Sequence, residues 1–286
     1  MYFFGRDEIC QNIIDKHSTG QSASLFGLRR SGKTSILLSI KRRIEAQGGY
    51  VSVVDCQIIY QVRWNLALLF LVKQLNSEHH AKIVIDDNSY SEDRAAISFI
   101  SDIEKINKKL RKSILLAFDE VEQITFDVSF SNEWKDGSSY VRFWHAIRSL
   151  YQKPEYPITI LVAGTNPRCL EVPFVMGGDN PLYGQIKPEY IPGFSINQAK
   201  QMLETLSSYM GICIDEDIYA YLVREFGGHP FLMRQACSYM KTEVDKLDSR
   251  KIDRLLYERS VLSFSQGAGH GFCEMVIGVL SEHYKD

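Results

Sequence analysis

Residues 27–34 read Gly27-Leu28-Arg29-Arg30-Ser31-Gly32-Lys33-Thr34, a complete G-x-x-x-x-G-K-T motif. An apolar run of strand length, residues 22–26, comes directly before it. Residues 34–46 follow, and their apolar side chains at positions 36, 37, 40 and 44 mark one face of a helix. A strand, a glycine-bounded loop and a helix start in this order predict a phosphate-binding loop. The alternative, a chance glycine turn, does not explain the flanking elements.

The spacing of this loop assigns chemistry to its residues. Glycines at both ends let the backbone curl until successive N–H groups point into one concavity. The helix N-terminus adds the positive end of its dipole. Lys33 is expected to bind the β- and γ-phosphates, and the Thr34 hydroxyl to ligate Mg²⁺. The nucleotide-binding residues expected here are Gly27, Arg29, Arg30, Ser31, Gly32, Lys33, Thr34 and Ser35.

A second part of the site is expected after residues 113–118, a continuous apolar run typical of a central parallel strand. The run ends in Asp119-Glu120. An acidic residue at the end of such a strand can hold Mg²⁺, so Asp119 is the expected metal ligand. Glu120 can then orient and deprotonate an attacking water. The alternative is that this strand simply ends in acidic residues.

A third strand is expected at residues 158–163, followed by a polar turn. Asn166 is the first choice for sensing the γ-phosphate or placing the water, with Thr165 and Arg168 as further candidates. Asn-Pro also initiates turns, which is the alternative interpretation. The expected catalytic residues are therefore Lys33, Glu120 and Asn166.

The composition excludes several classes of protein. The 286 residues carry a net charge of −2, so no global field attracts nucleic acid or membrane. No apolar run is long enough to span a bilayer, and the N-terminus has no signal-peptide pattern. Six scattered cysteines without a C-x-x-C pair are typical of a reduced, cytoplasmic protein. The one basic cluster, 105–112, is more typical of a solvated helix end than of a nucleic-acid site.

Strand-like and helical runs alternate up to about residue 165, which predicts an α/β fold with a parallel sheet. Residues 123–139 form a long segment with three aromatic side chains. It is expected either to be a surface loop whose aromatics pack on the sheet or to be a lid or partner-binding element. Residues 168–193 are rich in Pro and Gly and mark the end of the α/β core. After them the pattern is helical, with a Gly-rich segment before a final apolar run at 272–280.

Together these motifs resemble the STAND branch of P-loop ATPases, which are AAA-related, signal-transducing and built of numerous domains. The resemblance covers about residues 2–245. It rests on an ordered set of motifs: Phe4-Gly5-Arg6-Asp7-Glu8, the loop from Leu28 to Ser35, Val54-Asp55-Cys56, Phe118-Asp119-Glu120, Ala163-Gly164-Thr165-Asn166 and Gly227-Gly228-His229-Pro230-Phe231-Leu232.

The resemblance implies a three-layer α/β/α P-loop NTPase core at 1–192, a helical lid at 193–247 and a helical tail at 248–286. The tail is either the start of a third domain or packs on the helices before it. The core would have a five-stranded parallel sheet, with the third predicted strand between those ending at Gly27 and Asp119. Phe4, Gly5 and Arg6 would lie along the adenine, and Pro230 would close the nucleotide from the lid. Gly228, His229 and Pro230 can equally form a helix start.

The sequence also departs from this family. No arginine is clearly placed to stabilise the transferred phosphate from within the subunit. Arg142 and Arg148 are candidates for this role. A neighbouring subunit is the alternative source, through its Arg142, Arg148 or Arg168, and Arg234 is a candidate second sensor. The guanine-reading pattern N-K-x-D is missing from the sequence, which favours adenine.

The expected function is a switch that binds ATP, ADP and Mg²⁺ and hydrolyses ATP slowly, in bacterial defence or signalling. Its expected partners are further copies of the chain or an effector, with no membrane, and nucleic acid is not expected. One alternative is a DNA-associated motor or loader ATPase. The other is a structural module that binds ATP without turnover.

Overall fold

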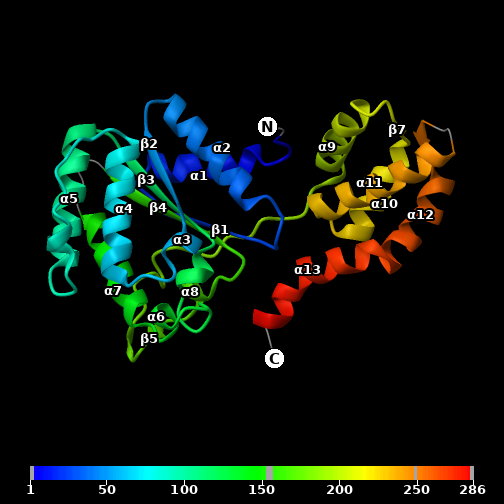
Figure 1. Ribbon diagram of the computed structural model, residues 1–286. Helices are drawn as coiled ribbons and strands as arrows, with labels where there is room; N and C mark the ends of the chain where they lie inside the picture. The colour runs from blue at the N-terminus through cyan, green and yellow to red at the C-terminus, as the bar shows by residue number, and fades with distance from the viewer. Residues whose placement is uncertain (1–2, 153–156, 248–249, 284–286) are drawn as a thin grey trace. The chain divides into compact units, whose positions relative to one another are not determined.

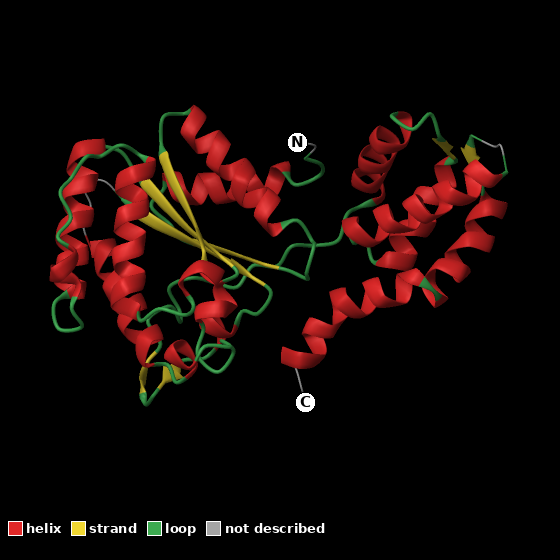
Figure 2. Ribbon diagram, viewed as in Figure 1, coloured by secondary structure: helices red, strands yellow, loops and turns green. Residues whose placement is uncertain are grey.

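A computed structural model describes residues 3–152, 157–247 and 250–283 (Figures 1 and 2). The start of the predicted core, 1–192, and both ends of the predicted tail, 248–286, therefore lie outside the described residues. The chain divides into two compact units. We call Ile9–Phe26 with Lys33–Tyr190 the sheet unit, and Met1–Glu8, Gly27–Gly32 and Ile191–Asp286 the helical unit. Within the described ranges, no helix has the length and apolar character needed to cross a membrane.

The sheet unit is built on a parallel sheet with the strand order β1-β4-β3-β2. Every residue of β1, β3 and β4 is buried, which explains their continuous apolar runs. The third predicted strand, β4, lies between β1 and β3, which confirms its predicted position. The strand bounds are β1 Ala23–Phe26, β2 Tyr50–Asp55, β3 Ile114–Asp119 and β4 Ile158–Gly164.

The sheet has four strands, so the prediction of five was wrong. Residues 187–190 run beside β1, where a fifth strand would lie, but make only one bridge to it, Phe26 with Tyr190. The Ser24 hydroxyl donates to the Lys187 carbonyl at 2.7 Å and accepts from the Glu189 N–H at 2.8 Å. This side chain takes the place of ladder hydrogen bonds, and Pro188 has no N–H to offer.

Helices cover both faces of this sheet (Figure 1). α1 and α2 lie on one side, and α4, α5 and α7 on the other. This arrangement follows from right-handed crossovers between the parallel strands. The bounds are α1 Asp7–Ser18, α2 Lys33–Ala46, α3 Cys56–Ile59, α4 Trp64–Glu78, η1 Asp87–Tyr90, α5 Ala95–Leu110, α7 Ser138–Arg148 and η3 Ser149–Gln152.

Residues 123–139 are short helices and turns rather than an open loop. They take in the end of η2 (Val121–Ile124) and all of α6 (Asn132–Lys135). Phe126 and Trp134 are buried, whereas Phe130 is 83% exposed. Two of the three aromatics therefore pack on the core, as the first interpretation predicted. The Pro- and Gly-rich connector after them contains α8 (Arg168–Glu171) and a hairpin of β5 (Phe174–Val175) and β6 (Gly178–Asp179).

The helical unit has its own apolar core, to which helices from α9 to α13 contribute. α9 begins with a capping box, in which Ser195 and Gln198 each bond the other's backbone N–H. The Gly-rich segment does not form a loop, because α12 ends at Gln266 and α13 begins at Ala268. The bounds are α9 Ile196–Ser208, β7 Cys213–Ile214, α10 Glu216–Phe226, α11 Pro230–Lys246, β8 Lys251–Ile252, α12 Arg254–Gln266 and α13 Ala268–His283.

Candidate nucleotide site

The predicted phosphate-binding loop follows β1 and leads directly into α2. Gly32 has φ +103°, a backbone conformation that favours glycine, and Arg30 also has a positive φ of +61°. A Cβ on Gly27 would lie 2.9 Å from the Ser31 Oγ, so this glycine lets the loop fold back on itself. The turn is closed by the Ser31 N–H, which donates to the Leu28 carbonyl at 3.2 Å. The loop thus ends at a helix N-terminus, where anions are favoured.

In the sheet unit, the first turn of α2 meets the end of β3. The Thr34 hydroxyl donates to Asp119 Oδ2 at 2.7 Å, and the other carboxylate oxygen accepts from the Glu120 N–H at 3.0 Å. Burial raises the pKa of Asp119, and the Thr34 hydrogen bond opposes that rise. The site offers a hydroxyl and a carboxylate, the hard oxygen ligands that suit Mg²⁺. No cluster of three or more His, Cys, Asp or Glu side chains able to hold a metal occurs among the described residues.

Glu120 has an unusual backbone conformation and an unusual pKa. Its φ of +54° and ψ of +44° lie in the left-handed region, which is uncommon outside glycine and often found at functional sites. Burial, followed by the nearby charge of Glu122, raises its pKa to about 7, although Lys33 acts in the opposite direction. A carboxylate with a pKa near neutrality suits a general base. Lys33 is itself only 5% exposed.

A further acidic residue, Glu122, was missed by the sequence analysis. Its side chain is 7% exposed and accepts from both the N–H and the hydroxyl of Thr165. The only signal in the sequence is a second glutamate in the D-E-V-E pattern, between Val121 and Ile124, which are both buried. A charged residue in such an apolar setting needs a partner, and here the partner comes from the end of β4.

The other candidates after β4 have structural contacts. Asn166 Oδ1 accepts at 2.9 Å from the N–H of Arg168, the first residue of α8. Arg168 pairs with Asp127 at 2.8 Å and lies over the Phe126 ring. Thr165, the residue before Asn166, is hydrogen bonded to Glu122 after β3. Whether Asn166 contacts phosphate stays a prediction.

In the helical unit, a cavity of about 320 Å³ lies beside the phosphate-binding loop. Arg6 is 4% exposed and stacks 4.4 Å over the Phe194 ring. Its Nε and Nη2 atoms, and the Ser31 hydroxyl, are buried with no hydrogen-bond partner in the described parts of the chain. Burial alone lowers the pKa of Arg6 to about 10. Buried polar groups are rarely left unpaired, so these donors fit a polar ligand. The lining residues are Arg6, Leu28, Ser31, Ile191, Pro192, Gly193, Glu225, Phe226, Gly227, His229, Pro230, Leu232, Cys273, Val276 and Ile277.

The Gly-His-Pro motif and the N-terminal segment belong to this same unit. His229 Nδ1 accepts from the Leu232 N–H at 3.4 Å as the N-cap of α11, and its Nε2 lies 3.1 Å from the Arg29 carbonyl. Pro230 is the first residue of α11 and also lines the cavity. The Gly5 carbonyl accepts from Gln198 Nε2 at 2.7 Å. Pro230 therefore both begins α11 and lines the cavity, so the two interpretations of this residue are compatible.

The remaining predicted residues have contacts or positions of several kinds. Arg142 pairs with Glu92 at 3.5 Å, and Arg234 lines a different cavity of about 280 Å³ beside α9 and α11. Arg30 stacks on Phe231 at 4.6 Å. Phe4 packs against the apolar core of the helical unit. Ser35 is the third residue of α2.

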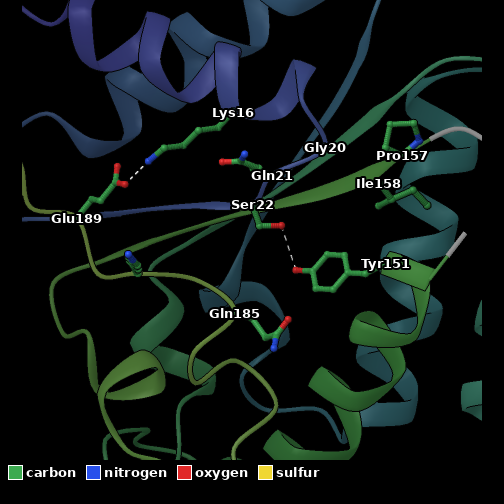
Figure 3. A pocket seen from close by; sticks show the side chains of 10 residues that line it. Lys16, Gly20, Gln21, Ser22, Tyr151, Pro157, Ile158, Gln185 and Glu189 are labelled. Carbon is green, nitrogen blue, oxygen red and sulfur yellow. Dashed lines mark hydrogen bonds and ion pairs between the residues drawn. The ribbon is translucent and has the colours of Figure 1, made fainter. Parts of the chain in front are cut away.

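A third cavity, of about 570 Å³, opens at the amino-terminal ends of β1 and β4 (Figure 3). Lys16 points toward Glu189, with which it forms an ion pair, and the Ser22 hydroxyl donates to that of Tyr151 at 3.2 Å. Asp119 and the phosphate-binding loop follow the carboxyl ends of β3 and β1. Ligands of open parallel sheets bind at the carboxyl ends, so this cavity lies outside the candidate site.

Comparison with known proteins adds information on the fold. The sequence matches no protein-family model and no curated protein. The structure resembles the RuvB Holliday-junction branch-migration motor of Thermotoga maritima, with a TM-score of 0.54 and 13% identity over 98% of this chain and 77% of that one. It also resembles a Walker-type ATPase of Pyrococcus abyssi, with a TM-score of 0.57 and 16% identity over 95% and 75% of the two chains. The chain has a P-loop NTPase fold. This fold explains why the first turn of α2 and the acidic end of β3 meet within the sheet unit.

Proposed function

We propose that this protein is an ATP- and Mg²⁺-binding switch that hydrolyses ATP slowly. The observation that carries the proposal is the 2.7 Å hydrogen bond between the Thr34 hydroxyl and Asp119, which joins the first turn of α2 to the acidic end of β3. In this proposal Lys33 binds the β- and γ-phosphates. Thr34 and Asp119 hold Mg²⁺, which would neutralise charge on the phosphates. Glu120 orients a water and accepts its proton.

We infer that the base is adenine and that it enters the cavity of the helical unit. The choice of adenine is supported by the resemblance of the Phe4-Gly5-Arg6 segment to adenine-binding segments of STAND ATPases. The unpaired donors of Arg6 and Ser31 in that cavity add a second reason to expect a polar ligand there. In this proposal Pro230 contacts the nucleotide from the Gly-His-Pro motif.

The switching role is proposed from the resemblance to STAND ATPases and from the chain path. The boundary between the two units falls inside the motif, between Gly32 and Lys33. Nucleotide would bias two arrangements of these units according to its differential affinity for them, with ADP favouring a closed form and ATP an open one. In this proposal the switch acts in bacterial defence or signalling in the cytoplasm. Its change of state controls assembly of the protein or activation of an effector.

Two variants test the site. Lys33→Ala should lose most of its ATP affinity by calorimetry while keeping its circular dichroism spectrum. Glu120→Gln should bind ATP but lose about 10²–10⁴ in turnover, because an amide cannot accept the proton. Unchanged affinity in a folded Lys33→Ala variant would refute the site. Turnover within about twofold of wild type in Glu120→Gln would favour a module that binds ATP as a structural ligand.

Assembly is proposed because an arginine that acts on the γ-phosphate typically contributes about 10³–10⁵ in rate. In this proposal a neighbouring subunit supplies this cation in a head-to-tail contact, from Arg142, Arg148 or Arg168. Arg142 and Arg168 are ion-paired within their own sheet unit. Turnover per subunit should therefore rise with protein concentration, in parallel with mass from light scattering. Constant specific activity of a monomer at every concentration would contradict this.

A DNA-associated motor is the alternative function, and the likeness to RuvB is the observation in its favour. The chain itself offers little for phosphate backbones. Its net charge is −2, and in its basic cluster Lys105 pairs with Asp102 and Lys109 bonds the Lys82 carbonyl. We expect no mobility shift with duplex or junction DNA at moderate salt. Binding whose logarithmic association constant falls linearly with the logarithm of salt concentration would favour the motor.

A further inference from the structure

We propose that Glu122 is a positioning residue for hydrolysis, which holds Glu120 in place by fastening the segment after β3 to the end of β4. This inference rests on the proposed function, since it assigns Glu120 as the base. Glu122 itself would contact neither ATP nor water. Its role is to fix the position of the residue that does.

The attachment to β4 is specific in its geometry. The Thr165 N–H lies 3.1 Å from each carboxylate oxygen of Glu122, and the Thr165 hydroxyl donates to Oε1 at 2.5 Å. Thr165 thus supplies two donors to the carboxylate of Glu122, a residue 43 positions earlier in the sequence. A charge-assisted pair of this kind is stronger than a neutral hydrogen bond.

The residue before Thr165 leaves space for this carboxylate. A Cβ on Gly164 would lie 2.1 Å from Glu122 Oε2 and 3.1 Å from a side-chain carbon of Val121. No side chain other than hydrogen fits there without moving Glu122. The glycine at the end of β4 therefore provides the space that the Glu122 carboxylate occupies.

The other end of the connection is Glu120. Glu120 is the N-cap of the short helix η2, which contains Glu122, and its carbonyl accepts from the Gln123 N–H at 2.9 Å. The nearby charge of Glu122 also contributes to the raised pKa of Glu120. The left-handed backbone of Glu120 is costly by itself and persists only where neighbouring contacts hold it. The bond from Glu122 to Thr165 is such a contact.

The energetic reason for a glutamate here is not fold stability alone. A buried carboxylate is expensive even when it is hydrogen bonded, and an apolar side chain of similar volume would often serve stability as well. A carboxylate that joins the base to the polar turn after β4 can instead transmit the position of that turn to Glu120. Small displacements of a catalytic group can cost about a hundredfold in rate.

The experiment measures kcat, KM and ATP affinity in the full chain carrying Glu122→Gln, Thr165→Val or both changes. Each single change removes part of the connection, so each should lower kcat by about ten- to a hundredfold. KM and the calorimetric Kd for ATP should stay within about twofold of wild type, because neither residue is proposed to bind nucleotide. The double variant should be little worse than either single one, because both changes break the same connection.

Thr165→Ser is the matched control, since it keeps both donors and removes only a methyl group. It should retain kcat within about threefold of wild type. If packing of the methyl group were what mattered at this position, Thr165→Ser would lose activity as Thr165→Val does. The Thr165 variants also test the inference if Glu122→Gln does not fold.

Three results would overturn the inference. Wild-type kcat in a folded Glu122→Gln variant is the first, and equal loss in Thr165→Ser and Thr165→Val is the second. The third is a fall in ATP affinity and melting temperature that accounts for the whole loss of activity, which would leave Glu122 a structural role only. A wild-type protein without ATP turnover would instead refute the proposed function, and this inference with it.

Discussion

The guanidinium of Arg6 stacks on the ring of Phe194 at 4.4 Å, and this contact holds a buried cation beside the phosphate-binding loop. Two of its donor atoms have no hydrogen-bond partner among the residues that the structure describes. The stacking orients the guanidinium plane but satisfies neither Nε nor Nη2. An unpaired buried donor costs about 1–3 kcal/mol. A nucleotide that accepts from these atoms would remove that cost on binding.

Replacement of Arg6 by methionine should therefore separate stability from binding. Arg6→Met should keep or raise the melting temperature of the nucleotide-free protein, because an apolar side chain removes the unpaired charge. It should weaken ADP binding by roughly 1.5–3 kcal/mol, the usual contribution of hydrogen bonds to a charged group. Differential scanning fluorimetry with and without ADP checks both. A variant that is destabilised without ADP yet gains the same shift with ADP would contradict this assignment of Arg6.

Removal of the metal should affect the wild type and Asp119→Asn differently. Asp119 is proposed to hold Mg²⁺ with Thr34, so chelation by EDTA should abolish wild-type hydrolysis and reduce ATP affinity. Asp119→Asn removes the charged ligand, so its ATP affinity should respond little to Mg²⁺. Calorimetric titration of ATP in Mg²⁺ and in EDTA measures the difference for each protein. Equal Mg²⁺ dependence in both would place the metal elsewhere.

Cys273 of α13 should report on occupation of the helical cavity, which it lines. Cys213 is exposed and Cys273 half-buried, whereas the other four cysteines are buried. In a Cys213→Ser background, ADP at ten times its Kd should slow alkylation of Cys273 about tenfold, because only the free protein would react. Tripolyphosphate, which has no base or ribose, should not protect it. Equal protection by both would argue that the base binds outside this cavity.

The stability of the sheet unit should depend on pH through His17. This residue is 5% exposed, its Nδ1 lies 2.5 Å from the Thr159 hydroxyl, and its Nε2 lies 3.2 Å from the Ser113 hydroxyl. Burial lowers its pKa in the folded protein, so the unfolded chain binds the proton more readily. Stability should therefore fall as the pH drops from about 6.5 toward the lowered value.

His17→Gln provides the matched comparison, because glutamine can keep hydrogen bonds at this position without titrating. Urea unfolding between pH 5 and 8 should show a steeper loss of stability on the acid side in wild type than in the variant. Parallel curves for the two proteins would show that other groups, such as His79 or His145, cause the dependence.

Much of the sheet unit and part of the candidate site could be predicted from local sequence. The phosphate-binding loop depends on glycines at set spacing, and Gly32 does have a positive φ. The apolar runs at β1, β3 and β4 predicted buried parallel strands, since only fully covered strands exclude polar side chains. Carboxyl ends of parallel strands lie at one edge, so Asp119 was expected near the loop, and its bond to Thr34 agrees.

Tertiary structure alone decided the features that depend on contacts between distant segments. Where a fifth strand was expected, the Ser24 side chain bonds the backbone of residues 187 and 189. This contact depends on tertiary packing, and strand propensity cannot predict it. Glu122 is an ordinary acidic residue in the sequence until folding brings Thr165 to it. Arg6 likewise becomes a buried cation only when Phe194 covers it, and two of its nitrogens then lack a partner within the described ranges. Sequence patterns report periodic burial, whereas the cost of a buried charge depends on which partners the fold places beside it.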